Sequence, residues 1–107
     1  MKPLQLQQGD VMLEQILFIP KTAIKKTSNQ NKQYILAHGE SNHYHAVEEE
    51  DGVEFYELNG TLFLKTEKEV DLTHQEHNTI TIEPGIYKIG RVREMDYTSL
   101  MERTVAD

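Results

Sequence analysis

Four of the five histidines in this 107-residue chain fall in two close pairs. His43 and His45 are two positions apart, and His74 and His77 are three positions apart. On a strand, side chains two positions apart point to the same face and lie roughly 6–7 Å from each other. Two neutral imidazoles at that separation can bind one metal ion or one substrate. Side chains three positions apart share a face only on a helix or a turn, and on a flat strand His74 and His77 would face opposite ways.

This histidine pattern predicts a metal site that acidic side chains complete. The candidate metal ligands are His43, His45, His74 and His77, and the carboxylates near them are Glu40, Glu49 and Glu76. Of these, Glu40 and Glu76 are the candidate catalytic groups, as ligand or general base. Two histidines with a carboxylate suit Fe(II) with open positions, and three histidines suit zinc with a bound water. An enzyme with such a site would carry out metal-assisted hydrolysis or Fe(II) chemistry.

A second interpretation keeps the histidines structural. The chain would then be a non-catalytic accessory or binding module, in which the histidines fix a turn or an interface. Ser41 lies two residues before His43, and a Ser–His pairing is conceivable. Nothing marks Ser41 as part of a strained turn, however, and ordinary turn chemistry explains it better.

The composition restricts the function further. A net charge of −7 argues against general nucleic-acid binding, which needs a surplus of Lys and Arg. Arg91 and Arg93 are therefore expected to pair with the surplus carboxylates. Cysteine is absent, so a transition metal would be bound by nitrogen and oxygen, and disulfides are excluded. The glycines form no phosphate-binding motif, so no organic cofactor is expected.

The sequence also bears on location. It contains no apolar run long enough to span a membrane, and no apolar signal core follows Met1. Together with the absence of cysteine, this predicts a cytoplasmic protein.

Short strands must position these residues. Strands are predicted over residues 9–19, 33–38, 43–47, 53–58, 61–66, 69–72, 79–82 and 86–92, a polar loop over 21–32, and a short helix or tail over 94–107. Seven or eight short strands separated by turns predict a single all-β domain over residues 1–107, a small barrel or sandwich. An exposed edge strand of such a sheet could support a homodimer.

The strongest local prediction is a hairpin around Asn59-Gly60. Asn-Gly supplies both positive φ angles that a type I′ turn requires. This turn sets Tyr56 opposite Phe63 and Glu54 opposite Lys65 on one face of the hairpin. An aromatic pair and an ion pair each add a few tenths to about 1 kcal/mol. Turn and cross-strand pairs therefore indicate the same register.

One set of motifs resembles that of the cupins, which are small metal-binding β-barrels. The residues that resemble the first cupin motif are Gly39, His43, His45, Glu49 or Glu50, and Gly52. Pro84-Gly85 resembles part of the second motif, although no histidine follows it and His74 and His77 precede it. The resemblance implies a cupin-like barrel whose histidines bind a metal.

A closer resemblance is to a family of small uncharacterised bacterial and phage-associated proteins, and it covers nearly the whole chain. The shared segments are Gln8-Gly9-Asp10-Val11, Leu36-Ala37-His38-Gly39-Glu40, His43-Tyr44-His45, Leu72-Thr73-His74-Gln75-Glu76-His77, Pro84-Gly85-Ile86-Tyr87, Arg93-Glu94 and Val105-Ala106-Asp107. The resemblance implies that Glu40, His43, His45, His74, Glu76 and His77 form one site. It implies no particular activity.

Overall fold

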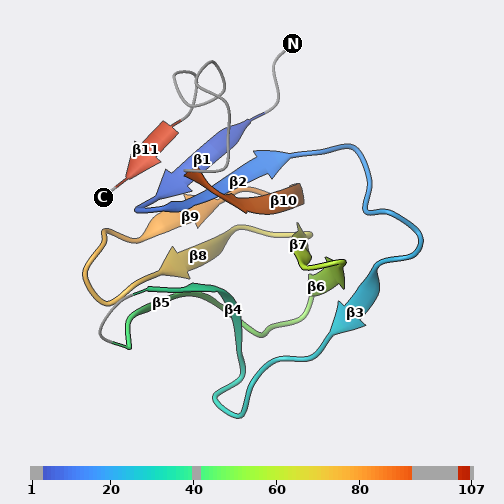
Figure 1. The fold of residues 1–107 in the computed structure, drawn as a ribbon, viewed down its shortest axis with the longest axis horizontal. Helices are drawn as coiled ribbons and strands as arrows, with labels where there is room; N and C mark the ends of the chain where they lie inside the picture. The colour runs from blue at the N-terminus through green and yellow to red at the C-terminus, as the bar shows by residue number, and fades with distance from the viewer. Residues whose placement is uncertain (1–3, 40–41, 93–103, 107) are drawn as a thin grey trace.

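The computed structural model describes residues 4–39, 42–92 and 104–106, and these form two β-sheets (Figure 1). In order across the larger sheet, the strands are β11 (Thr104–Ala106), β1 (Gln5–Gln8), β2 (Val11–Gln15), β10 (Gly85–Arg91), β7 (Thr61–Thr66), β6 (Val53–Leu58) and β3 (Ile24–Lys26). In the smaller sheet they are β4 (Gln33–His38), β5 (Tyr44–Glu48), β8 (Val70–Thr73) and β9 (Ile80–Ile82). The pairing of β1 with β11 is parallel, and the other pairings are antiparallel.

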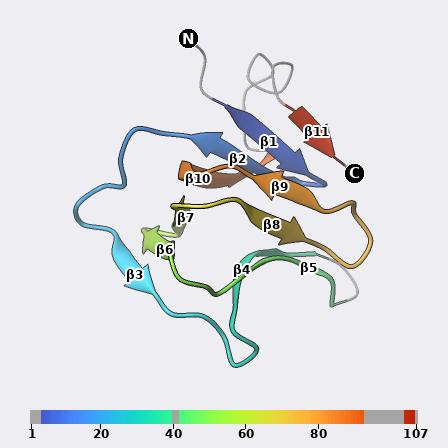
Figure 2. The same ribbon diagram turned by 180° about the vertical axis from the view of Figure 1, so that it is seen from behind.

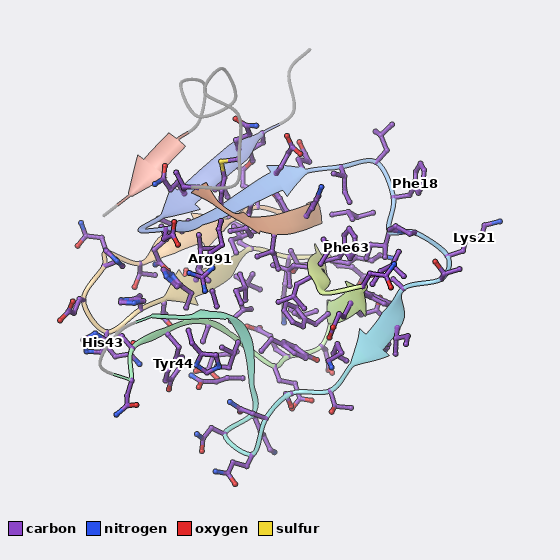
Figure 3. All side chains as sticks on the ribbon, viewed as in Figure 1. Phe18, Lys21, His43, Tyr44, Phe63 and Arg91 are labelled. Atoms are coloured by element: carbon purple, nitrogen blue, oxygen red, sulfur yellow. The ribbon has the colours of Figure 1, made fainter. Side chains whose placement is uncertain are left out.

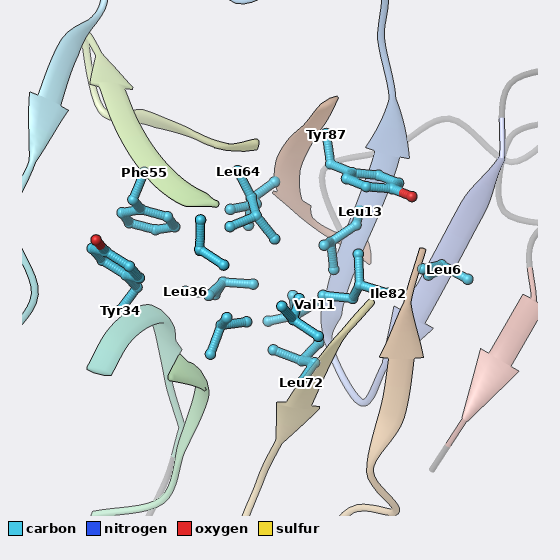
Figure 4. Close-up of a cluster of buried hydrophobic side chains, with 14 residues drawn as sticks. Leu6, Val11, Leu13, Tyr34, Leu36, Phe55, Leu64, Leu72, Ile82 and Tyr87 are labelled. Carbon is cyan, nitrogen blue, oxygen red and sulfur yellow. The ribbon is translucent and has the colours of Figure 1, made fainter. Parts of the chain in front are cut away.

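Apolar side chains from both sheets form one core between them (Figure 4). Tyr34 of β4 stacks on Phe55 of β6 with ring centres 5.3 Å apart, which joins the two sheets directly. Leu64 of β7 and Leu72 of β8 are fully buried in the same cluster. The sheets do not close into a barrel. The predicted all-β fold is therefore confirmed in its sandwich form.

The hairpin around Asn59-Gly60 has the predicted geometry. Asn59 and Gly60 have φ angles of 50° and 85°. Tyr56 pairs with Phe63 and Glu54 with Lys65 in the register of β6 and β7. This hairpin lies within the larger sheet, where β10 pairs with β7 and β3 pairs with β6.

The prediction was wrong about the first strand and the polar loop. The strand expected over residues 9–19 is limited to β2 (Val11–Gln15), and a strand that was not predicted, β1 (Gln5–Gln8), precedes it across a tight turn at Gly9, where φ is 56°. The run Gln5–Gln8 lacks the alternation of a half-buried strand, yet Gln5 and Gln8 are buried along with Leu6. Residues 24–26, expected in a loop, form β3, because pairing with β6 satisfies their backbone groups at the sheet edge.

The expected short helix or tail over residues 94–107 falls mostly outside the described residues. The part that is described, Thr104–Ala106, is a strand that pairs with β1, as Figure 2 shows from behind. Eleven strands are thus present in the described ranges, where seven or eight were predicted. The additional strands are short and lie mainly at sheet edges, where hydrogen bonding rather than apolar patterning defines them. The described ranges hold no helix long and apolar enough to cross a membrane.

Candidate histidine site

Three connections gather at one end of the sandwich (Figures 1 and 2). They are the turn between β1 and β2, the turn that leads into β5, and the connection between β8 and β9. His45 lies in β5, and His43 comes one residue before that strand begins. Asn42 precedes it with a left-handed φ of 64°, a conformation that asparagine adopts more readily than most residues. His74 and His77 lie in the bend that follows β8, outside the strands.

The four paired histidines lie together in space. The ring centre of His74 is 4.4 Å from that of His45, 4.4 Å from that of His77 and 5.6 Å from that of His43. The rings of His45 and His77 are 5.8 Å apart and nearly parallel. The expectation that two pairs distant in sequence meet in one place is therefore confirmed. The fifth histidine, His38, contacts Tyr44 instead.

The side chain of Gln8 determines which nitrogen of His45 carries the proton. Gln8 is fully buried, and its Nε2 donates to the carbonyl oxygens of Leu72 at 2.8 Å and Asn78 at 2.9 Å. Its Oε1 must then face Nδ1 of His45, 2.8 Å away. An oxygen in that position accepts a hydrogen bond, so Nδ1 of His45 carries the proton. Nε2 of His45 consequently keeps a free lone pair.

His74 has the opposite arrangement. Its Nδ1 accepts the backbone N–H of Glu76 at 3.0 Å and that of His77 at 3.3 Å. In the neutral ring, the proton is therefore on Nε2. This contact holds the turn that carries the second histidine pair, because one side-chain atom satisfies two backbone donors.

His77 lies directly over the turn between β1 and β2. A Cβ atom added to Gly9 would be 2.5 Å from Nε2 of His77, closer than real Cβ contacts allow. A glycine is therefore required at position 9 for two reasons: the backbone has a positive φ, and the ring of His77 leaves no room for a Cβ atom. His43 lies at the rim of the cluster, where its Nδ1 is 3.6 Å from Oε1 of Glu76.

The environment favours neutral imidazoles. Burial lowers the pKa of His45 to about 4, and the nearby His74, His77 and Arg91 add to this shift. Burial, together with His77 and His43, also lowers the pKa of His74. Nitrogen must be unprotonated to bind a metal ion, and near neutral pH His45 and His74 meet that condition.

Arg91 connects two segments at the same end of the sandwich. Its guanidinium is 2.9 Å from the carboxylate of Asp10 and donates to the carbonyl oxygen of His38 at 3.1 Å. The predicted pairing of Arg91 with a carboxylate is confirmed; Figure 3 shows where Arg91 lies. Arg93 lies outside the described residues.

The candidate carboxylates differ in their position relative to the histidines. Glu76 is beside His43, as the site prediction requires. Glu40, like Ser41, lies outside the described residues. Glu49 and Glu50 follow the far end of β5 from the histidines, and Glu50 forms an ion pair with Lys68 at 2.7 Å. The cupin-like ligand role for Glu49 or Glu50 is therefore not supported by their position. Within the described ranges, no three His, Asp or Glu side chains are arranged as they stand to hold a metal ion.

No role for Gln8, Gly9 or Asp10 was predicted from the sequence, although they belong to one of the segments that carry the family resemblance. A signal was present, since a glutamine directly before a Gly-Asp turn ends a short strand and can reach across to another sheet. Only the tertiary structure shows that it reaches His45.

Comparison with known proteins agrees with the expectation of a small uncharacterised family. Residues 7–92 match the model of a family described as "Domain of unknown function (DUF8820)". The chain belongs to this family, and the matched region includes all four paired histidines together with Gln8 and Gly9. No curated protein and no solved structure matches the chain.

Proposed function

We propose that the histidine cluster binds one divalent transition metal ion, zinc or ferrous iron. The observation that carries this proposal is the triangle of His45, His74 and His77, whose ring centres are 4.4, 4.4 and 5.8 Å apart. Two imidazoles that bind the same zinc ion through Nε2 at about 2 Å have ring centres about 5 Å apart. Rotation of the rings, together with a rearrangement of the turn from His74 to His77, would bring three nitrogens to one ion, and His43 at the rim would take the fourth position where no water or substrate does.

The contact between Gln8 and His45 supports the same proposal. Histidines that bind metals usually donate their second N–H to an acceptor of the protein, which fixes the tautomer. His45 has this acceptor in Oε1 of Gln8, at 2.8 Å. Its pKa of about 4 means that protons compete weakly for Nε2 at neutral pH.

Binding through Nε2 of His74 would have a cost. Its Nδ1 would have to carry the proton and would lose the two backbone N–H groups that it accepts now. Two such hydrogen bonds contribute about 1–3 kcal/mol together. Binding of zinc at a structural site contributes on the order of 10 kcal/mol, which exceeds the cost of losing these hydrogen bonds. The turn from His74 to His77 should therefore rearrange when the ion binds.

An enzymatic role would follow from an open position on the ion. Three imidazoles and one open position suit metal-assisted hydrolysis. Glu76 is the described carboxylate beside the cluster, since its Oε1 is 3.6 Å from Nδ1 of His43, and we assign it the role of general base in such a reaction.

Metal content tests the proposal. The protein is purified without chelators or a histidine tag, and bound metals are measured by elemental analysis alongside the variant His45→Gln/His77→Gln. His38→Gln is the matched control, because His38 lies outside the cluster. The expected result is about one ion per chain in the wild type and the control and almost none in the double variant. Equal metal content in all three proteins, or none in the wild type, would refute metal binding.

One observation favours a second function, that of a metal-free binding module whose histidines are structural. Nδ1 of His74 already accepts hydrogen bonds from two backbone N–H groups of its own turn, and Nδ1–H of His45 already donates to Oε1 of Gln8. A zinc titration, monitored through the amide NMR resonances of Glu76 and His77, separates the two functions. Resonances that shift in proportion to one bound ion support the metal site, and resonances that stay in place support the metal-free module.

A further inference from the structure

The connection between β2 and β3 exposes large apolar side chains. Leu17, Phe18 and Ile24 are 90%, 69% and 70% exposed, and no other large apolar side chain of the described residues is as open to solvent. Single exposed apolar residues are common, but adjacent ones such as Leu17 and Phe18, which line the same hollow, are typical of an interaction surface. The connection is held in place at its start, where the N–H of Ile16 donates to the carbonyl oxygen of Ile86. The exposed side chains are thus presented from an anchored segment.

Two hollows of about 620 and 360 Å³ lie on either side of Phe18 and Pro20. Phe63 lines the larger hollow and Tyr56 the smaller one. These two residues pair across β6 and β7, and Lys88 of β10 pairs with Phe63. The row that they form is on the outer face of the larger sheet, because the adjacent row faces the core.

The charged side chains around these hollows have one sign. Lys21, Lys65 and Lys88 line them, and no carboxylate does, in a chain with 18 acidic and 11 basic residues. Lys65 is opposite Glu54 in the hairpin. Lys21 and Lys88, in contrast, have no carboxylate within ion-pair distance among the residues described.

The carboxylates near these lysines are bound to other side chains. Glu14 pairs with Lys88 across β2 and β10, but its carboxylate accepts a hydrogen bond from Gln5 at 3.1 Å. On the adjacent strand β3, Lys25 and Lys26 are each paired with a glutamate, at 3.2 and 3.1 Å. The lysines beside the exposed apolar side chains are therefore the ones left to attract an acidic group from outside.

We propose that this surface, formed by Ile16, Leu17, Phe18, Lys21, Phe63 and Lys88, binds a segment of a partner protein in which apolar side chains stand next to Asp or Glu. Apolar side chains of the partner enter the hollows beside Phe18 and provide most of the affinity, as buried anchors do at interfaces. Its carboxylates approach Lys21 and Lys88, which orient the segment and speed its association.

A second copy of this chain fits the surface less well. A symmetric dimer through it would bring the same patch of each copy together and so place lysines of one sign opposite each other. The surface is also remote from the histidines: Figure 3 shows Phe18 and Lys21 at one end of the molecule and His43 at the other. Partner binding is therefore independent of the proposed metal site, and each can fail without the other.

Selection from a displayed library of random peptides tests the proposal with the full chain as bait. Enriched peptides are synthesised with a fluorescent label, and their affinity is measured by anisotropy. We expect enriched sequences to combine apolar residues with Asp or Glu. Their affinity should fall by about tenfold or more for Leu17→Ser/Phe18→Ser, since anchor residues contribute at least that much. Thermal melting confirms that the variant is folded.

Charge variants complete the test. Lys21→Glu/Lys88→Glu should weaken binding and reverse its dependence on salt, because salt screens the new repulsion, whereas Lys25→Glu/Lys26→Glu, which changes the net charge equally, should affect it far less. The proposal is overturned if no peptide is enriched, if the enriched peptides lack acidic residues, or if they bind Leu17→Ser/Phe18→Ser unchanged. A wild-type dimer in sedimentation that Leu17→Ser/Phe18→Ser abolishes would also overturn it, because the occupant would then be a second copy.

Discussion

The carboxamide of Gln8 determines the tautomer of His45, which is 37 positions away along the chain. Both donor hydrogens of Gln8 are used by carbonyl oxygens, so only its oxygen can face the imidazole. The contact joins β1 of the larger sheet to β5 of the smaller one. It therefore does two things at once, in that it orients a candidate ligand and ties the sheets together at the histidine end.

Replacing this amide should destabilise the fold. Gln8→Ala leaves the buried ring N–H of His45 without its acceptor and removes the two hydrogen bonds that the amide donates, and we expect a loss of about 3 kcal/mol in the free energy of unfolding. Urea denaturation measures it. Gln30→Ala, at an exposed position, should change the free energy by less than about 0.5 kcal/mol. An equally small effect of Gln8→Ala would show that the contact is unimportant for stability.

Gly9→Ala should be more harmful than Gly60→Ala. Both glycines have a positive φ, of 56° and 85°, so both substitutions incur strain of about 1 kcal/mol. At Gly9 the new methyl group also collides with the ring of His77, whereas nothing lies within 4 Å of the corresponding position at Gly60. Thermal melting of the two variants gives the difference. The added variant His77→Ala should remove most of the excess cost at Gly9, and no recovery would contradict the predicted collision.

Stability without metal should depend on pH through His45. Its pKa is about 4 in the folded protein and 6.5 in the unfolded chain. The unfolded chain therefore binds the proton first as pH falls, so folding is favoured above pH 6.5 and loses up to about 3 kcal/mol between pH 6.5 and 4. The comparison is between wild type and His45→Gln, in urea denaturation at several pH values with a chelator present. Parallel curves for the two proteins would show that His45 does not titrate as the structure indicates.

Zinc should stabilise the protein with the logarithm of its excess over the dissociation constant. At a hundredfold excess the gain is about 2.7 kcal/mol, measured as a rise in melting temperature. The gain should shrink as pH falls, because protons compete for the imidazole nitrogens. His45→Gln/His77→Gln should show no rise, and His38→Gln should keep it. A rise that survives in the double variant would place the ion elsewhere on the molecule.

The contact between Tyr34 and Phe55 should be important for joining the sheets. Phe55→Ala opens a cavity in the core and removes the stacked ring, and we expect a cost of about 3–5 kcal/mol. Phe18→Ala is the matched control, since it removes the same side chain from an exposed position and should cost little. Urea denaturation compares the two. Equal costs would mean that Phe18 packs more closely than its exposure indicates.

Several local elements followed from the sequence because neighbouring residues define them. The Asn59-Gly60 turn and its cross-strand pairs were predicted in register, since a type I′ turn allows only one alignment of the strands that flank it. That His74 and His77 would not share a face on a flat strand was also predicted from their spacing, and both lie outside the strands. The polar strand Gln5–Gln8 and the short strand Ile24–Lys26 were not, because what makes them strands is a neighbour in the sheet rather than their own pattern.

By itself, then, the sequence determined an all-β chain, the central hairpin, and a histidine-rich candidate site without thiolates. The tertiary structure decided which sheet each strand joined, and it alone brought Gln8 to His45 and His77 to Gly9. The reason is physical: turn geometry and alternation depend on a few adjacent residues, whereas contacts between distant residues depend on how the whole core packs.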